Sequence, residues 1–278
     1  MSELLAAATD IARRAGKLLA DKLHQARTVD FKGEGRVNLV TDADTASEAL
    51  ILAELCARFP DHAVLAEESG ASGQGRHVWY VDPLDGTTNY AHGVPHFCVT
   101  LAVEGPVDGA SALLAGVVFD PLRDECFTAA RGQGAFLNGA RIRVSDGSTL
   151  GRALLCTGFP YDLHQAPEGP LGLFVRIAQR AQGMRRMGSA ALDLAYVAAG
   201  RFDGFFEFGL KPWDTAAGAL LIQEAGGVMR RIDGAPYEPA YGDVMAAGPG
   251  VVGPLSAECG AFLKSFGWKP RRYDARTS

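Results

Sequence analysis

Hydrophobic side chains near the N-terminus recur at the spacing of an amphipathic helix. Within residues 2–24, apolar positions return every three or four residues, and charged residues fall elsewhere on the helix. This pattern predicts a surface helix docked on the core. A second helical pattern runs from Ala43 to about Phe59. Thr41 or Asp42 stands where it can cap the first turn of this second helix.

The middle of the chain contains short apolar runs that are separated by turn residues, which is the pattern of β-strands. A glycine-rich stretch at Gly132–Gly139 predicts a hairpin. The predicted strands of this region are Ala63–Leu65, Val78–Val81, Phe97–Val103, Leu113–Phe119 and Glu125–Ala129.

Strand and helix patterns alternate in the second half of the chain, which indicates a layered α/β or α+β architecture. Ser189 is placed to cap the helix that follows it, and Gly200 is placed to stop that helix. The predicted strands are Ala153–Thr157, Phe205–Phe208, Val228–Ile232 and Val244–Ala246. The predicted helices are 170–182, Ser189–Ala199, Asp214–Ala225 and Pro254–Phe266.

Composition narrows the class of protein. The chain has 278 residues, of which 47% are hydrophobic, so it can bury a large core in one domain or two fused lobes. Its net charge of −5 argues against a global nucleic-acid footprint, which is normally basic. No apolar run approaches the roughly 20 residues of a membrane helix, and the N-terminus does not resemble a secretion signal.

The cysteines favour a reducing, cytoplasmic location. Their number is odd, their spacings are wide and no CxxC motif occurs, so neither a disulfide framework nor a zinc site is expected. The five cysteines are Cys56, Cys98, Cys126, Cys156 and Cys259.

An acidic turn at Asp82–Thr88 is the strongest candidate for chemistry. It follows the predicted strand Val78–Val81 and reads Asp-Pro-Leu-Asp-Gly-Thr-Thr. Carboxylates and backbone carbonyls are the ligands of hard cations such as Mg²⁺. The Gly86 backbone and the Thr87 hydroxyl would lie beside such a cation and could orient a water molecule or hold a phosphate oxygen. The alternative is a structural turn in which aspartate caps locally.

Other acidic residues stand at the ends of predicted elements. Glu67 follows an apolar run, Asp44 lies near the start of the second helix, and Asp214 precedes an apolar helix. Taken singly, Glu67 could be a solvated loop residue and Asp214 a plain N-cap. If these acids converge, cations must offset the repulsion between their carboxylates. Because no cysteine or histidine cluster is present in the sequence, the carboxylate oxygens favour Mg²⁺ or Mn²⁺ over Zn²⁺. Two-metal carboxylate sites most often handle phosphate esters.

Three motifs, in this order and at fitting separations, resemble the inositol monophosphatase family. They are Glu67-Glu68-Ser69, the stretch from Asp82 to Asn89, and Trp213-Asp214-Thr215-Ala216-Ala217-Gly218 through Glu224-Ala225-Gly226-Gly227. The stretch from Arg185 to Tyr196 is especially similar to the bacterial members. The resemblance extends from the first helix to about Trp268.

The resemblance implies an α+β fold, a layered αβαβα sandwich of the inositol monophosphatase and fructose bisphosphatase type. One domain would span residues 1–268, with an N-terminal α+β lobe of about 1–150 and a C-terminal α/β lobe of about 151–268. Residues 269–278 would form a polar, flexible tail. The enzyme would be a lithium-sensitive homodimer that uses about two to three Mg²⁺ ions per subunit, with Mn²⁺ as an alternative.

The resemblance also implies roles for the acidic residues. Glu67, Asp82 and the Leu84 carbonyl would hold the first ion, while Asp82, Asp85 and Asp214 would hold the second. A third, weaker ion would lean on Glu67 through water. These are the residues of the acidic turn and of its two neighbouring motifs.

Catalytic roles are implied for a further pair of residues. Thr87 together with Glu67 would position the attacking water, and Asp44 would assist through the Thr87 hydroxyl. The phosphate would rest on the metals and on the backbone of Gly86, Thr87 and Thr88.

Substrate contacts are implied for the second half of the chain. Ser189, Ala190 and Glu207 would contact inositol hydroxyls, because an ionised carboxylate can accept from two adjacent hydroxyls. Arg185 would lie at the substrate pocket. The alternatives are an exposed strand acid for Glu207 and a surface or dimer-contact cation for Arg185.

Two rival functions remain open. Relatives with the same metal core hydrolyse histidinol phosphate, fructose bisphosphate or phosphoadenosine phosphate, and core motifs cannot discriminate among these substrates. The resemblance to the bacterial members also implies an interaction with RNA polymerase or antitermination factors, alongside retained phosphatase activity. The acidic pI of about 5.7 argues against direct, nonspecific RNA binding. The alternative is a local nucleic-acid patch of arginines, made of Arg176, Arg180, Arg185 and Arg186.

Overall fold

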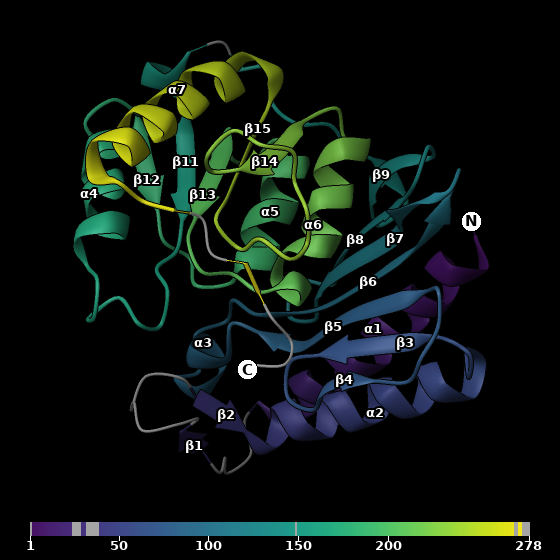
Figure 1. Cartoon of the computed structure of the whole chain (residues 1–278). Helices are drawn as coiled ribbons and strands as arrows, with labels where there is room; N and C mark the ends of the chain where they lie inside the picture. The colour runs from purple at the N-terminus through teal and green to yellow at the C-terminus, as the bar shows by residue number, and fades with distance from the viewer. Residues whose placement is uncertain (1, 24–28, 32–38, 148, 270–271, 274–278) are drawn as a thin grey trace.

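The computed structural model describes residues 2–23, 29–31, 39–147, 149–269 and 272–273. In this part of the chain, two large β-sheets alternate with three layers of helices (Figure 1). The architecture is α+β and the layers follow the order αβαβα, which confirms the fold that the resemblance implied.

The larger sheet is built from the first half of the chain and is mostly antiparallel. Its strand order is β10-β9-β8-β7-β6-β5-β3-β4, and within it β3 and β5 pair in parallel. A separate antiparallel pair joins β1 (Val29–Phe31) and β2 (Leu39–Thr41). The strands of the large sheet are β3 (Ala63–Ala66), β4 (Gly70–Ser72), β5 (Val78–Asp85), β6 (Cys98–Val107), β7 (Ala110–Asp120), β8 (Glu125–Ala130), β9 (Gly134–Leu137) and β10 (Ala140–Arg141).

The smaller sheet is built from the second half of the chain and has the order β12-β11-β13-β15-β14. The strand β11 pairs in parallel with β12 and β13, whereas the remaining pairs are antiparallel. Its strands are β11 (Leu154–Thr157), β12 (Gly183–Arg185), β13 (Gly204–Glu207), β14 (Val228–Arg231) and β15 (Val244–Ala247).

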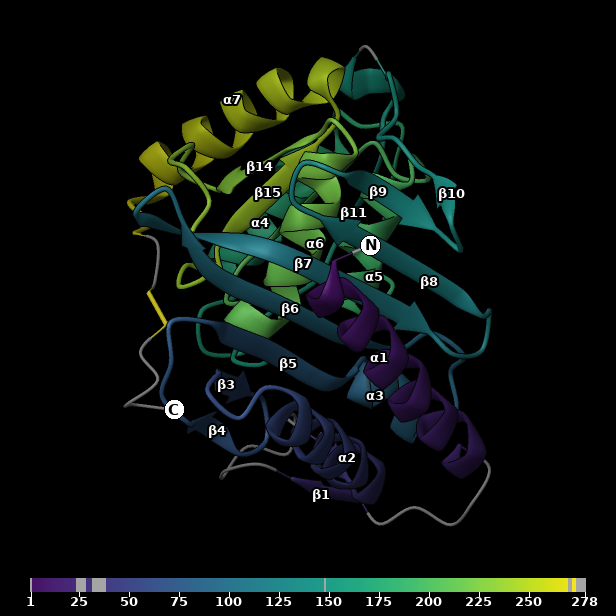
Figure 2. The same cartoon turned by 90° about the vertical axis from the view of Figure 1, so that its right-hand side faces the viewer.

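Three pairs of helices form the other layers. Helices α1 and α2 cover the outer face of the large sheet, α5 and α6 lie between the two sheets, and α4 and α7 cover the smaller sheet (Figures 1 and 2). Across the described ranges, no helix combines the length and hydrophobicity that a membrane span requires. The helices are α1 (Glu3–Lys22), α2 (Asp42–Arg58), α3 (Thr87–Ala91), the 3₁₀ turn η1 (Leu150–Arg152), α4 (Glu168–Ala178), α5 (Ala190–Ala198), α6 (Pro212–Glu224) and α7 (Pro249–Phe266).

Most of the predicted elements are confirmed. The first amphipathic pattern forms α1, although its last predicted residue, 24, lies outside the described residues. The second pattern forms α2, whose N-cap is Thr41; the Thr41 hydroxyl accepts from the Ala43 amide and Asp44 completes a capping box. Gly200 follows the end of α5 with a φ of 70°, a left-handed conformation that glycine adopts without strain.

Some element boundaries differ from the prediction. Helix α7 begins at Pro249 rather than at Pro254, so that Pro254 lies inside the helix. The short elements α3 and β12 were not predicted, because neither is long enough to show a periodic pattern. The predicted tail, 269–278, lies largely outside the described residues, but Tyr273 is hydrogen-bonded through its backbone N–H to the Ala240 carbonyl at 2.7 Å.

The contact between α5 and α6 depends on Gly218. A Cβ at this position would stand 2.5 Å from Leu194 Cβ, and Leu194 is fully buried between the sheets. We expect Gly218→Ala to destabilise the protein by about 1–3 kcal/mol despite the better helix propensity of alanine. Gly260→Ala is the matched control, since a Cβ there meets nothing within 4 Å, and this variant should be neutral or stabilising. Urea unfolding of both variants checks the contrast; equal stabilities would contradict it.

A buried histidine just before β6 should make stability depend on pH. His96 is 4% exposed and its two ring nitrogens have no hydrogen-bond partner among the described residues. Burial, aided by the nearby Arg123, lowers its pKa from 6.5 to about 4. Between these values the unfolded chain binds a proton that the folded protein does not, so stability is complete above pH 6.5 and falls as the pH falls.

We expect wild type to lose about 2 kcal/mol more than His96→Phe between pH 7 and pH 5. The phenylalanine ring can keep the edge contact that His96 makes with Tyr196, whose ring centroid is 6.0 Å away. Urea midpoints of the two proteins at both pH values measure the difference. Identical losses would show that His96 does not carry this effect.

Candidate active site

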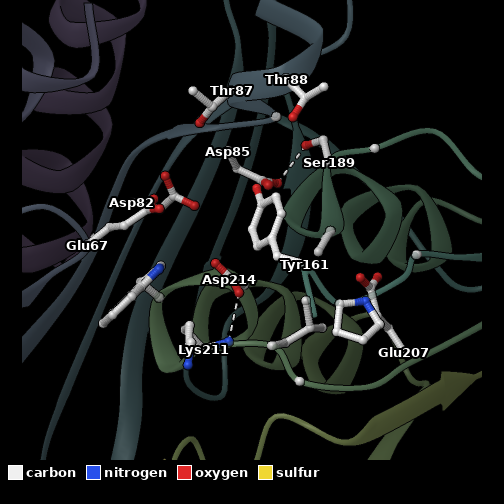
Figure 3. A pocket seen from close by; sticks show the side chains of 18 of the residues that line it. Glu67, Asp82, Asp85, Thr87, Thr88, Tyr161, Ser189, Glu207, Lys211 and Asp214 are labelled. Atoms are coloured by element: carbon white, nitrogen blue, oxygen red, sulfur yellow. Dashed lines mark hydrogen bonds between the residues drawn. The ribbon is translucent and has the colours of Figure 1, made fainter. Parts of the chain in front are cut away.

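A cavity of about 490 Å³ lies where the end of β5 meets the beginnings of α3, α5 and α6 (Figure 3). Loops after β3, β11 and β13 complete its walls. The lining contains seven acidic residues and two basic residues. The acidic residues are Glu67, Glu68, Asp82, Asp85, Asp193, Glu207 and Asp214, and the basic residues are Arg186 and Lys211.

The irregular end of β5 positions the first carboxylate. The register of β5 against β6 shifts between Asp82 and Asp85, which re-aims the backbone at that point. Asp82 is 1% exposed, and its Oδ1 accepts a hydrogen bond from the Leu84 amide at 2.9 Å. The Pro83 carbonyl accepts from the Ser47 hydroxyl of α2 at 2.8 Å. The acidic turn is therefore fixed to the helical layer behind it.

Asp85 connects the acidic turn to α5. Its Oδ2 accepts from the Ser189 hydroxyl at 2.6 Å and from the Ala191 amide at 2.7 Å. Ser189 occupies the N-cap position of α5 as predicted, but it makes no side-chain capping bond. Asp85, from another part of the chain, satisfies the start of this helix instead, where a negative charge is favourable.

Asp214 is both a capping residue and a candidate ligand. It is the third residue of α6, and its Oδ2 accepts from the Lys211 amide at 2.7 Å (Figure 3). The other carboxylate oxygen, Oδ1, accepts no hydrogen bond from the described residues. The N-cap interpretation and the ligand interpretation of Asp214 are thus compatible.

Thr87 links the cavity to Asp44. The Thr87 hydroxyl lies 3.1 Å from Asp44 Oδ1 and 3.1 Å from the Leu84 carbonyl oxygen, both of which accept. Asp44 is fully buried, and its Oδ2 accepts from the amide and the hydroxyl of Thr41. Because these donors hold the Asp44 carboxylate in place, the Thr87 hydroxyl has a fixed direction. Gly86, just before α3, has a φ of 96°, which favours glycine.

The carboxylates around the cavity raise one another's pKa values. Burial raises the pKa of Asp82 well above its ordinary value, and the charges of Glu67, Asp85 and Asp214 raise it further. Burial and then Asp85 and Glu67 likewise raise the pKa of Asp214. The two basic residues of the lining are too few to balance these converging negative charges. A divalent cation stabilises such an arrangement.

The donor set fits magnesium. Carboxylate and carbonyl oxygens line the wall that Glu67, Asp82, Leu84 and Asp85 form, and these are hard ligands. No three acidic, histidine or cysteine side chains of the described ranges are gathered tightly enough to hold an ion on their own. Magnesium tolerates such an open site, because it keeps several waters and substrate oxygens in its coordination shell.

Glu207 stands at another part of the cavity wall, at the end of β13. It is 7% exposed, so the alternative of an exposed strand acid is wrong. Burial raises its pKa to about 8, whereas Arg186 acts in the opposite direction. Gly158 leaves room for this carboxylate, because a Cβ at that position would collide with both Glu207 oxygens.

The structure brings almost all of the predicted site residues to one cavity. Asp44 is absent from the lining and reaches it only through Thr87, in agreement with its predicted indirect position. Arg185 is also absent from the lining, and its exposed guanidinium donates to the Met184 carbonyl. The residues that line the cavity as expected are Glu67, Asp82, Leu84, Asp85, Gly86, Thr87, Thr88, Ser189, Ala190, Glu207 and Asp214.

The prediction that Arg185 lies at the pocket is therefore wrong. Arg186 lines the cavity instead. Arg185 is the last residue of β12, and successive side chains of an extended segment point to opposite sides. A shift of one residue in the predicted position consequently exchanges the inward and the outward arginine.

Several further lining residues were not predicted, among them Asp193, Tyr161, Lys211 and Tyr273. Asp193 lies one helical turn after Ser189, a spacing from which it could have been found. Tyr161 follows the end of β11 and points toward the acidic residues (Figure 3). Lys211 and Tyr273 meet there through tertiary packing, for which the sequence pattern offers no local signal.

Comparisons with known proteins identify the family of this chain. The model of the inositol monophosphatase family matches residues 1–260. This chain belongs to the inositol monophosphatase family. Among curated members, the Nus factor SuhB of Escherichia coli K12 is 43% identical over 254 residues, which cover 91% of this chain and 94% of the relative. The Nus factor SuhB of Pseudomonas aeruginosa is 45% identical, with 88% and 92% covered.

Solved structures of the family have the same fold. The extragenic suppressor protein SuhB from Bartonella henselae superposes with a TM-score of 0.84 at 37% identity, covering 93% of this chain and 98% of that protein. An inositol monophosphatase from Anabaena superposes with a TM-score of 0.81 at 39% identity, covering 95% and 98%. Membership of the inositol monophosphatase family thus supports phosphatase activity.

Proposed function

We propose that this protein is a magnesium-dependent phosphatase that hydrolyses myo-inositol monophosphate to inositol and phosphate. The observation that carries the proposal is the convergence of Glu67, Asp82, Asp85 and Asp214 on one cavity in a member of this family. Their mutual effect on pKa calls for cations, and their oxygens suit magnesium.

The metal ligands of the proposal come from three segments. Glu67, Asp82 and the Leu84 carbonyl would hold one ion, and Asp82, Asp85 and Asp214 a second, with a third weaker ion near Glu67. When bound, these ions supply a nucleophilic water at neutral pH and stabilise the leaving oxygen. The chain's own contribution is to bring the carboxylates together and to hold them in fixed directions.

Thr87 and Glu67 are proposed to position the water that attacks phosphorus. The Thr87 hydroxyl is held by Asp44 and the Leu84 carbonyl, so it can present a lone pair to a water in the cavity. The exposed backbone at Gly86, Thr87 and Thr88, where α3 begins, would receive the phosphate oxygens.

The alcohol part of the substrate is proposed to lie toward Glu207. Ser189 and Ala190 line the cavity between Asp85 and Glu207, and the Glu207 carboxyl can bond to hydroxyls of a polyol. Arg186, rather than Arg185, is the arginine of this wall. A polyol fits such a polar wall better than an apolar alcohol does.

A panel of phosphate esters tests the choice of substrate. With Mg²⁺ present, inositol monophosphate should have the highest kcat/KM when compared with histidinol phosphate, fructose bisphosphate and phosphoadenosine phosphate. A higher kcat/KM for one of the other three esters would keep the phosphatase and overturn the substrate. Lithium should inhibit the turnover, and Mn²⁺ should partly replace Mg²⁺.

We also propose that the protein acts in transcription antitermination, because relatives at 43% and 45% identity are named Nus factors. In an E. coli strain that lacks SuhB, the gene for this chain should restore transcription antitermination. Asp85→Asn, expected to be inactive as a phosphatase, should restore it as well. Loss of rescue with this variant, if it folds, would tie the cellular role to catalysis.

The arginines proposed for a nucleic-acid patch are partly neutralised. Arg176 and Arg180 pair with Glu258, with N···O distances of 2.7 and 3.0 Å. A protein partner such as RNA polymerase or an antitermination factor is therefore favoured over direct RNA binding. We further propose a cytoplasmic homodimer. Light scattering of the purified protein measures the oligomeric state, and a monomeric mass would overturn this part.

A further inference from the structure

A residue beyond the stretch that the family model matches lines the cavity. The match to the inositol monophosphatase family ends at residue 260, whereas Tyr273 belongs to the segment that follows α7. Tyr273 nevertheless stands in the cavity lining together with Lys211, Trp213 and Asp214 of the α6 N-terminus. The segment after α7 thus reaches, at Tyr273, the wall that carries one of the proposed metal ligands.

Backbone contacts fix Tyr273 on the body of the protein. Its amide donates to the Ala240 carbonyl at 2.7 Å, and the preceding Arg272 forms an antiparallel bridge with Tyr241. Upstream, the indole N–H of Trp268 donates to Asp243 Oδ2 at 3.0 Å. The segment is therefore attached on both sides of residues 270–271 to the same loop, 240–243.

That loop also supports the wall of the cavity. Asp243 is fully buried, and its Oδ1 accepts from the Gly209 amide at 2.9 Å. The Leu210 amide donates to the Gly242 carbonyl at 3.1 Å. Because Gly209 and Leu210 line the cavity, the loop joins the chain end to the wall through short, direct contacts.

The Tyr273 ring contacts two residues of the wall. Its centroid is 5.5 Å from that of Trp213 with an interplanar angle of 80°, an edge-to-face arrangement. The Lys211 ammonium lies over the ring at 5.2 Å from the centroid, within the range of a cation–π interaction. Lys211 forms no ion pair with another described residue. The ring is thus the aromatic partner that fixes this flexible cation.

A positive charge held in place would help this acidic cavity to bind a phosphate dianion. The lining has seven acidic residues but only Arg186 and Lys211 as basic ones, so it repels a phosphate dianion unless cations compensate. Lysine has a long stem that loses about 2 kcal/mol of rotamer entropy when it is held in place. A ring that restricts Lys211 beforehand lowers this loss when the substrate arrives.

We propose that Tyr273 is a positioning residue for substrate binding, which holds the Lys211 ammonium at the cavity wall to attract the phosphate dianion. This inference rests on the proposed phosphatase function. It assigns to the chain end a part of the substrate site that residues 1–260 lack. Since the attraction acts before and during the reaction alike, it affects KM rather than kcat.

Steady-state kinetics with inositol monophosphate and Mg²⁺ test the proposal with Tyr273→Ala, Lys211→Met and the double variant. Each single variant should raise KM about 3- to 5-fold with kcat nearly unchanged. The double variant should match Lys211→Met, because Tyr273 acts through Lys211. Tyr273→Phe should behave as wild type, since the ring and not the hydroxyl holds the ammonium. Arg272→Ala is the control, as its exposed side chain belongs to the same segment but not to the lining.

The dependence of kcat/KM on ionic strength gives a readout that a merely structural role would not change. Its slope should flatten equally in Tyr273→Ala and Lys211→Met. An unchanged KM in Tyr273→Ala, effects that multiply in the double variant, or a Tyr273→Phe variant as impaired as Tyr273→Ala would each overturn the proposal. If wild type hydrolyses no ester with Mg²⁺, the proposed function fails and this inference fails with it. If wild type is active but the variants give any of the three contradicting results, only the inference is refuted.

Discussion

Asp82→Asn is expected to lower kcat/KM for inositol monophosphate by about 10³-fold or more at saturating Mg²⁺. Asp82 is the carboxylate shared by both proposed ions, and the loss of one fixed electrostatic contact at a reacting centre already costs about 10²–10³-fold. The fold should persist, because an asparagine oxygen can still accept from the Leu84 amide. Phosphate release at several Mg²⁺ concentrations measures the effect.

The same variant should be more stable than wild type in the presence of a chelator. Its substitution removes one charge from a buried cluster in which Glu67, Asp85 and Asp214 oppose ionisation. It should also lose the rise in thermal midpoint that Mg²⁺ gives wild type. Asp108→Asn, the same chemical change in an exposed turn, is the matched control and should leave both properties unchanged. More than a tenth of wild-type kcat/KM in Asp82→Asn would refute its role.

Thr87→Ala is expected to lower kcat by about 10²-fold with little change in KM. The Thr87 hydroxyl is buried between Asp44 and the Leu84 carbonyl and is proposed to direct the attacking water. A group that matters chiefly in the transition state changes kcat rather than KM. Initial rates over a range of substrate concentrations separate the two parameters.

Two variants control for the Thr87 prediction. Thr87→Ser keeps the hydroxyl and should recover most of the activity. Thr88→Ala changes the neighbouring, exposed threonine of the same helix and leaves its backbone N–H in place, so kcat should stay within about threefold of wild type. If Thr87→Ala raised only KM, or if Thr87→Ser were equally impaired, the proposed direction of the water would be wrong.

Sequence patterns predicted the elements that are long or whose ends carry clear capping or terminating residues. Helix α2 begins where Thr41 caps it, and α5 ends before Gly200, because both signals are local. The start of α7 was missed because Pro254 suggested a first turn, whereas the first helical residue is another proline, Pro249. The five layers were expected only from the resemblance. The strand order within each sheet was not predicted, since strand pairing depends on contacts between distant parts of the chain.

The candidate site was predictable where its acidic residues lie near the ends of strands and helices. Asp82 and Asp85 lie in the last part of β5 and Asp214 lies in the first turn of α6, so the sequence showed them and the fold brought them together. Arg186 was missed because a register of one residue decides which arginine faces inward. Tyr273 was missed because its place depends on the docking of the chain end against Ala240, which no local pattern encodes.

The proposed function is tested most directly by the release of phosphate from myo-inositol monophosphate, measured with the wild-type protein as Mg²⁺ is titrated from chelator-treated conditions. We predict no turnover without the metal, a rise with Mg²⁺ to saturation, and inhibition by added lithium. No turnover at any Mg²⁺ concentration, or turnover that a chelator leaves unchanged, would contradict it.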